Sequence, residues 1–292
     1  MERIADFKCG YDNANGFGTW AGEEYGILFP QAYKEADMMR KLALAVKEHE
    51  RAGICYLPFC HTLEAEALGG KIKLGDGLTG PRVERAVCSS LEDVLELPSI
   101  LLNDHKTDRL RETMEACKTL KEMGESVVFL VSGPMTILNG LMESEVLFRA
   151  LRKTPELVIQ TFEKLGSDVL AVMKLAEAAE VDAISYADPS GGVNLVGPKI
   201  AEKIARGFTM EFLKQADEML DKKIPIYLCP KTAFALIGTE LARWRDWQLE
   251  EAMEYSAAVE HLKGKIRFVG QDCVKHVGHR LENRILKELV LR

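Results

Sequence analysis

The chain has no apolar run long enough to cross a bilayer, and residues 1–8 lack the apolar core of a signal peptide. It also has no segment rich in glycine, serine and proline that would separate two domains, and no low-complexity tract. Its 292 residues, 47% of them hydrophobic, are enough for one continuous core. We therefore expect a single cytoplasmic domain over residues 1–292, with no membrane partner.

An excess of positive charge is missing too. The net charge is −7 and the sequence pI is about 5.6, whereas proteins that bind a phosphate backbone normally present a basic face. We therefore expect no nucleic-acid partner. The seven cysteines are odd in number and lack the dense spacing of a secreted disulfide framework, so most are expected to be reduced thiols.

Short apolar runs alternate with helical segments, and each run ends at a polar or chemically special residue. The runs occupy residues 54–59, 126–131, 182–187, 224–228 and 266–269. The residues that follow them include Cys60 with His61, Ser132, Asp188, Cys229 and Cys273. Where parallel strands alternate with helices, the carboxyl ends of the strands meet in one mouth, which is where barrel enzymes place their active sites. The sequence therefore predicts a pocket lined by these residues.

The segments between the runs carry helical periodicity. They predict helices at 31–51, 90–96, 106–123, on both sides of Thr154, along 200–220, and between 239 and 263, the last carrying Trp244 and Trp247. This alternation predicts an α/β protein, a single (β/α)8 TIM-type barrel. Candidates for the weaker barrel strands are 71–74, 85–88 and 284–292. An open doubly wound sheet is the alternative, but no glycine-rich phosphate loop follows the early strands.

Several segments, by their order and spacing, resemble the uroporphyrinogen decarboxylase superfamily, and within it the methylcobamide:thiol methyltransferases. The segments are 57–69, 132–136, 154–180, 188–199 and 226–232. The resemblance implies a (β/α)8 barrel that binds one zinc ion through a His-x-Cys pair at a strand end and a later cysteine. It also implies that the zinc ion holds an acceptor thiol as thiolate, which takes a methyl group from a methylcorrinoid on a partner corrinoid protein.

Carried over to this chain, the resemblance assigns Cys229 to the cysteine of the pair and Cys273 to the later one, so both are expected to bind Zn²⁺. The chain departs from the family in two ways. Tyr227, a poor zinc ligand, stands where the family has histidine, and Cys273 follows Cys229 much sooner than usual, so the carboxyl-terminal part is short. The sequence leaves the replacement ligand open among Cys60, His61, Glu64, His276 and His279.

We expect His61 and Asp188 to face the substrate as catalytic residues. Further substrate contacts are expected from residues at or near the strand ends: Cys60, Ser132, Tyr227, Lys231 and Gln271. The glycine- and asparagine-rich start, within residues 1–30, is interpreted either as a lid over the pocket or as a flexible start.

The leading hypothesis is a corrinoid-dependent methyltransferase that moves a methyl group from a methylcorrinoid protein to a zinc-activated thiol or a related small-molecule acceptor. A uroporphyrinogen decarboxylase-type lyase is weaker. Its polycarboxylate substrate requires an arginine-rich amino-terminal stretch in the family, and residues 1–30 contain only Arg3. The third hypothesis is a non-catalytic barrel that binds a corrinoid or another small molecule and has lost the metal, as Tyr227 permits.

Overall fold

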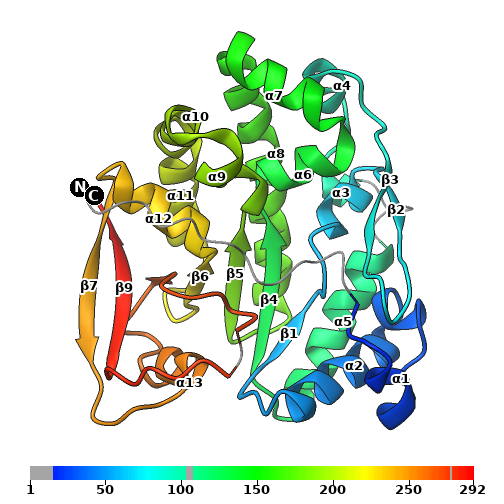
Figure 1. Ribbon diagram of the computed structural model, residues 1–292, viewed down its shortest axis with the longest axis vertical. Helices are drawn as coiled ribbons and strands as arrows, with labels where there is room; N and C mark the ends of the chain where they lie inside the picture. Colours follow the sequence, from blue (N-terminus) through cyan, green and yellow to red (C-terminus); the bar gives the residue numbers. More distant parts are fainter. Residues whose placement is uncertain (1–15, 103–107, 277) are drawn as a thin grey trace.

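A central sheet organises the molecule (Figure 1). The computed structural model describes residues 16–102, 108–276 and 278–292, and within these ranges seven strands pair in the order β1-β4-β5-β6-β8-β9-β7. The first five are parallel: β1 (Cys55–Leu57), β4 (Val127–Ser132), β5 (Ala183–Ala187), β6 (Ile226–Leu228) and β8 (Phe268–Val269). Each lies within or at the end of one of the five apolar runs, so the strand predictions are confirmed.

The last two strands run against this pattern. β9 (Ile285–Leu291) is antiparallel both to β8 and to β7 (Ala242–Gln248), and β7 pairs with it along its full length. The prediction of a long helix between 239 and 263 is therefore wrong: Trp244 and Trp247 lie on β7, and helix is confined to α13 (Tyr255–His261). Aromatic side chains fit a half-buried pleated surface well, and β9 supplies the partner that makes this strand stable.

The first candidate for a weak barrel strand, 71–74, lies in a separate hairpin. β2 (Lys71–Lys73) and β3 (Arg82–Arg85) pair only with each other, antiparallel, and most of their side chains are exposed or half-buried. The expectation that 71–74 belongs to the barrel is therefore wrong, because β2 has no face to bury against the central sheet. The second candidate, 85–88, forms no strand of the central sheet either: Arg85 ends β3, and Cys88 forms an isolated bridge with Met142. The third candidate, 284–292, does join the sheet as β9.

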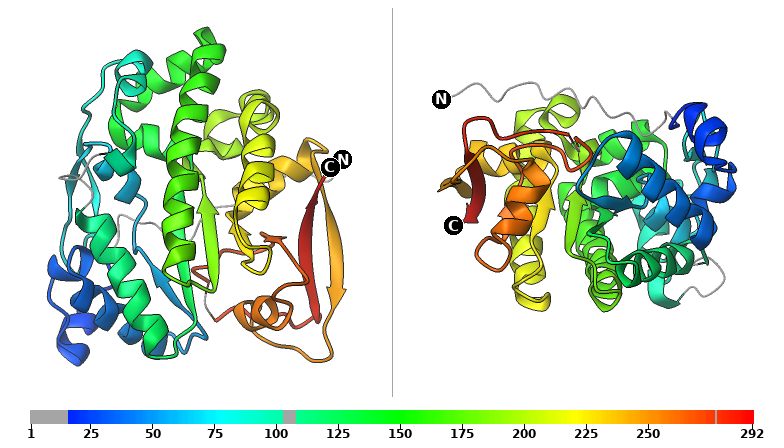
Figure 2. Two further views of the ribbon diagram at one scale, coloured as in Figure 1. Left: turned by 180° about the vertical axis from the view of Figure 1, so that it is seen from behind. Right: turned by 90° about the horizontal axis from the view of Figure 1, so that it is seen from below.

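Helices cover the outer face of the sheet. α5 (Asp108–Glu122) and α8 (Pro155–Ala178) lie along β4, as the view from behind makes plain (Figure 2). The expected helices are confirmed at α2 (Ala36–His49), α4 (Leu91–Leu95), α5, α7 (Ser144–Lys153), α8, α10 (Pro198–Ile204) and α11 (Met210–Met219). The remaining helices are α1 (Trp20–Tyr25), α3 (Leu63–Ala67), α6 (Pro134–Leu141), α9 (Val193–Val196) and α12 (Pro230–Gly238). None of the described helices is long and apolar enough to cross a membrane.

The two faces of the parallel strands enter different cores, because successive side chains of a strand point to opposite sides. Phe129 of β4 packs with the outer helices, whereas Val128 and Leu130 join an inner cluster with Tyr227 of β6 and Tyr255 of α13. The inner face of the sheet therefore carries this cluster, and the carboxyl ends of the strands lie beyond it. Of the expected lid or flexible start, residues 1–15 lie outside the described part. Residues 16–18 hydrogen-bond to the backbone at 77–78, between β2 and β3.

Candidate active site

A cavity of about 490 Å³ lies at the carboxyl ends of the parallel strands. Each strand contributes to its wall: His61 follows β1, Thr136 follows β4, Ser190 follows β5, Cys229 follows β6 and Cys273 follows β8. Arg82 and Val83 of the hairpin close one side, and Lys275 lies beside Cys273 in the wall. The structure therefore brings three of the expected site residues, His61, Cys229 and Cys273, to one cavity from three separate strands.

Cys229 is positioned by the start of a helix. It is the N-cap residue of α12, with Pro230 in the first helical position, and its amide donates to the Tyr186 carbonyl at 2.9 Å. Its side chain is half-buried. The exposed N–H groups of a helix N-terminus favour negative charge, so this position suits a sulfur that acts as thiolate.

Cys273 lies on the loop that follows β8. Gly270 lets this loop pass close to β6 and α12, since a Cβ there would stand 2.7 Å from the Ala233 Cβ and 3.1 Å from the Leu228 carbonyl oxygen. Asp272 then orients the next peptide, because its Oδ1 accepts the Cys273 amide at 2.7 Å. The half-buried Cys273 thiol is thereby held in the cavity wall.

His61 is an uncharged ring in the cavity wall. Burial, and secondly the charge of Lys275, lowers the pKa of His61 to about 3, so the imidazole is neutral at physiological pH. Its Nδ1 is buried and has no hydrogen-bond partner in the described part of the chain. A neutral imidazole with an unused nitrogen is the form of histidine that binds metals or accepts a proton.

Asp188 turns away from the cavity. Its carboxylate accepts the Met135 amide (3.2 Å) and both the amide and the hydroxyl of Thr136 (2.8 Å each), so it binds the first turn of α6. Burial raises the pKa of Asp188 to about 6, and these hydrogen bonds oppose the rise. In this structure Asp188 anchors the helix that presents Thr136 to the cavity, and its substrate-facing role stays a prediction.

Two further candidates lie behind the cavity wall. Cys60 is buried with its Sγ 2.6 Å from the Arg109 guanidinium and 3.2 Å from the Thr62 hydroxyl. The Ser132 amide donates to the buried Glu64 carboxylate at 2.9 Å. Neither Cys60 nor Ser132 belongs to the cavity lining, because each is engaged on the side of the helices.

The other three expected substrate contacts are also engaged elsewhere. Tyr227 packs in the inner cluster, its ring 5.6 Å from that of Tyr255. Lys231 borders a separate hollow of about 20 Å³ beside Asp188. Gln271 accepts the Lys287 amide and so binds β9. Being near a strand end does not determine which way a side chain points. Arg82, which does line the cavity, comes from the hairpin and carried no signal in the sequence.

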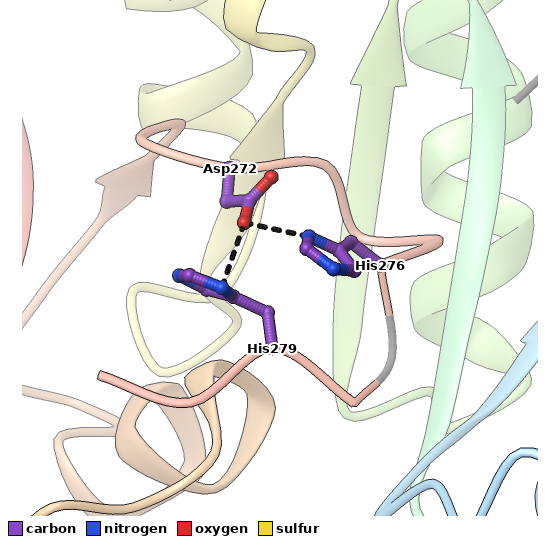
Figure 3. Close-up of side chains that lie close together, drawn as sticks. All are labelled: Asp272, His276 and His279. Carbon is purple, nitrogen blue, oxygen red and sulfur yellow. Dashed lines mark hydrogen bonds and ion pairs between the residues drawn. The ribbon is translucent and has the colours of Figure 1, made fainter. Parts of the chain in front are cut away.

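The cavity offers donors suited to zinc. Two cysteine sulfurs and one neutral imidazole are the ligand types that a borderline-soft cation prefers, so the residues fit the metal by chemistry. In this structure, however, the ligand atoms of Cys229, Cys273 and His61 are not all within 4.8 Å of one another. In the described part of the chain, the residues whose ligand atoms do lie this close together are Asp272, His276 and His279, on the loop that carries Cys273 (Figure 3).

Comparisons with known proteins agree with this architecture. The uroporphyrinogen decarboxylase (URO-D) family matches residues 21–271. The methylcobamide:CoM methyltransferase MtaA of Methanosarcina barkeri is 24% identical over 252 residues, which are 85% of this chain and 72% of that protein. The methylcobamide:CoM methyltransferase MtbA of Methanosarcina acetivorans is 24% identical over 247 residues, 84% of this chain and 71% of that protein.

Among solved structures, a methyltransferase from Methanosarcina mazei superimposes with a TM-score of 0.63 at 21% identity, covering 77% of this chain and 67% of that one. This similarity is evidence for the fold alone. Together with the family match, it confirms the predicted fold class, an α/β protein of the TIM-barrel type. The chain belongs to the uroporphyrinogen decarboxylase (URO-D) family, and within it to the branch that resembles the methylcobamide:thiol methyltransferases.

Proposed function

We propose that this protein is a corrinoid-dependent methyltransferase that moves a methyl group from a methylcorrinoid, carried by a partner protein, to a thiol acceptor in the 490 Å³ cavity. The names of the relatives support the reaction class. The observation that carries the proposal is the meeting of Cys229, Cys273 and a neutral His61 at one cavity at the mouth of the sheet. Thiol chemistry at a barrel mouth needs such a set of donors.

Zn²⁺ is the cofactor that this donor set suits. Cys229 and Cys273 would hold it, with His61 as the third ligand, once the three side chains move closer together than they lie in this structure. When bound, zinc supplies a soft positive charge that keeps an acceptor thiol deprotonated. Because burial lowers the pKa of His61 to about 3, no proton competes for its nitrogens near neutral pH.

The charges in the cavity wall favour an anionic acceptor. Arg82 and Lys275 both line the cavity, and His61 is uncharged, so the two side chains supply the positive charge of this part of the wall. Coenzyme M, the acceptor in the names of the relatives, is a small thiol with a sulfonate group. We propose that Arg82 and Lys275 orient the anionic end of the acceptor, so that its thiol lies toward Cys229 and Cys273.

The experiment measures zinc content and methyl transfer from methylcobalamin to coenzyme M. Cys229→Ser and Cys273→Ser should each lower thiol-dependent zinc affinity and transfer about 100-fold or more, because each removes a direct ligand. Cys88→Ser is the control, since Cys88 is buried outside the cavity. The proposal fails if the protein takes up no zinc through these thiols and transfer is the same in all three variants.

The same assay separates the alternatives. A barrel that only binds a corrinoid would retain cobalamin without turnover, whatever the state of the cysteines. A decarboxylase would release carbon dioxide from a polycarboxylate tetrapyrrole. Among the described lining residues the cations are Arg82 and Lys275, and His61 is neutral. Two positive charges are few for a substrate with several carboxylates.

A further inference from the structure

The loop after β8 gathers three ligating side chains outside the cysteine pair. His276 Nδ1 lies 2.9 Å and His279 Nδ1 lies 3.3 Å from the same oxygen, Asp272 Oδ2, and all three ligand atoms are within 4.8 Å of one another (Figure 3). The two imidazole rings stack with their centroids 5.0 Å apart. Two imidazoles and a carboxylate thus converge on one point.

These distances suit the edges of a metal coordination shell. Ligands at about 2.1 Å from a divalent ion are about 3.0 Å apart in octahedral and about 3.4 Å apart in tetrahedral geometry. The two observed separations, 2.9 and 3.3 Å, are close to these values. Imidazole nitrogen with carboxylate oxygen is a set that zinc, cobalt, nickel and related ions accept.

The backbone orients the three ligands in advance. Asp272 Oδ1 is occupied by the Cys273 amide at 2.7 Å, which leaves Oδ2 directed at the imidazoles. The His276 amide donates to the Cys273 carbonyl (2.9 Å), and the His279 amide donates to the His276 carbonyl (3.0 Å). The His279 carbonyl in turn accepts the Tyr255 amide of α13 at 2.9 Å. The hydrogen bond to Asp272 Oδ1 is of the kind that orients metal-ligating carboxylates, and the backbone hydrogen bonds fix the loop that carries the two histidines.

The three side chains are accessible from solvent. The exposed fractions are 25% for Asp272, 46% for His276 and 32% for His279, so a hydrated cation can reach the ligands and water can complete its shell. A simple ion pair is the competing interpretation. In it both imidazoles donate to Asp272 Oδ2, which a carboxylate oxygen can accept, so metal uptake in the titration below distinguishes the two interpretations.

We propose that Asp272, His276 and His279 bind a divalent transition-metal ion at a site separate from the cysteine pair. The ion ties the two ends of the loop together. Because Cys273 and Lys275 lie on the same loop and line the cavity, the bound ion holds them in place. The site thus stabilises one wall of the cavity without contacting the substrate.

The test uses the full chain without a histidine tag and with Cys229 and Cys273 replaced by serine. Titration with Co²⁺ should show one ion with an absorption spectrum of nitrogen and oxygen ligands and no sulfur-to-cobalt charge transfer. His276→Gln with His279→Gln in this background should weaken binding about 100-fold or more, because two direct ligands are lost. His261→Gln is the matched control, a histidine on α13 outside the loop, and should change nothing.

A second measurement needs no variant. Diethyl pyrocarbonate labelling of the wild-type chain, analysed by mass spectrometry, should show that Zn²⁺ protects His276 and His279 but not His261. The proposal is overturned if the chain with Cys229 and Cys273 replaced takes up no cobalt, if the double glutamine variant binds as tightly as its parent, or if Zn²⁺ gives no protection. Loss of the thiol-dependent zinc alone would count against the proposed function and leave this site intact.

Discussion

Replacing Asp188 with alanine tests how the cavity wall is held. The carboxylate accepts three hydrogen bonds from the first turn of α6: from the Met135 amide, the Thr136 amide and the Thr136 hydroxyl. Asp188 is only 8% exposed, so these donors would be left without an acceptor in a buried place. We expect Asp188→Ala to destabilise the protein and to loosen Thr136 in the cavity wall.

The magnitude follows from two opposing effects. A buried donor without a partner costs about 1–3 kcal/mol, so three donors cost roughly 6 kcal/mol. Against this, alanine removes a buried charge. Burial raises the pKa of Asp188 from 3.8 to about 6, and this difference of about 2 corresponds to about 3 kcal/mol of penalty for the ionised form at pH 7. The expected net loss of unfolding free energy is about 3 kcal/mol at pH 7.

The pH dependence has a definite sign. A carboxyl group whose pKa is higher in the folded than in the unfolded state binds more protons when folded, so its contribution to stability is lost as pH rises from about 4 to about 6. Asp188→Ala lacks this titration. The variant should therefore cost about 6 kcal/mol near pH 4 and only about 3 kcal/mol at pH 7.

Urea denaturation of wild type and variant at several pH values between 4 and 7 measures this difference. Asp93→Ala is the control, because Asp93 also accepts three hydrogen bonds at a helix start, from Ser89 and Ser90, but is only half-buried. The Ser89 hydrogen bonds hold the pKa of Asp93 below its ordinary value, so its pH dependence has the opposite sign. An Asp188→Ala cost that is no larger than the control, or that grows with pH, would refute the reasoning.

Three further predictions concern the same region. Gly133→Ala would put a Cβ 2.6 Å from the buried Tyr186 hydroxyl, so it should destabilise the protein by about 1–3 kcal/mol, and an unchanged melting temperature would contradict this. Tyr227→Phe should leave zinc content and methyl transfer unchanged, because the ring packs in the inner cluster; lost activity would mean that the hydroxyl contacts the substrate. Lys275→Met should leave the pKa of His61 well below 6.5, since burial is the larger cause, and an NMR titration midpoint near 6.5 would disprove it.

The parallel strands could be predicted because their signal is local. A strand buried on both faces is apolar at nearly every position, and β4 is buried at all six. β7 is different. Its side chains are mostly half-buried or exposed, and its only described partner is β9, near the end of the chain. Periodicity over 239–263 therefore favoured a helix, because the pairing that stabilises the strand is not visible in that segment.

The site was predictable in part for a related reason. An apolar run followed by a thiol or an imidazole showed where Cys229, Cys273 and His61 lie along the strands, and the topology of parallel strands implied that they meet. The sequence did not show the direction of each side chain. Asp188 also follows a strand, yet its carboxylate binds α6, because the buried helix start needs an acceptor.

By its order of apolar runs and special residues, the sequence alone determined the strands β1, β4, β5, β6 and β8, the mouth at their carboxyl ends, and the family. Only the tertiary structure decided that β9 and β7 complete the sheet antiparallel, and that Asp272, His276 and His279 converge on one point. The physical reason is the range of the interactions. Burial and periodicity act within a segment, whereas strand partners and ligand geometry depend on distances that exist only once the chain has folded.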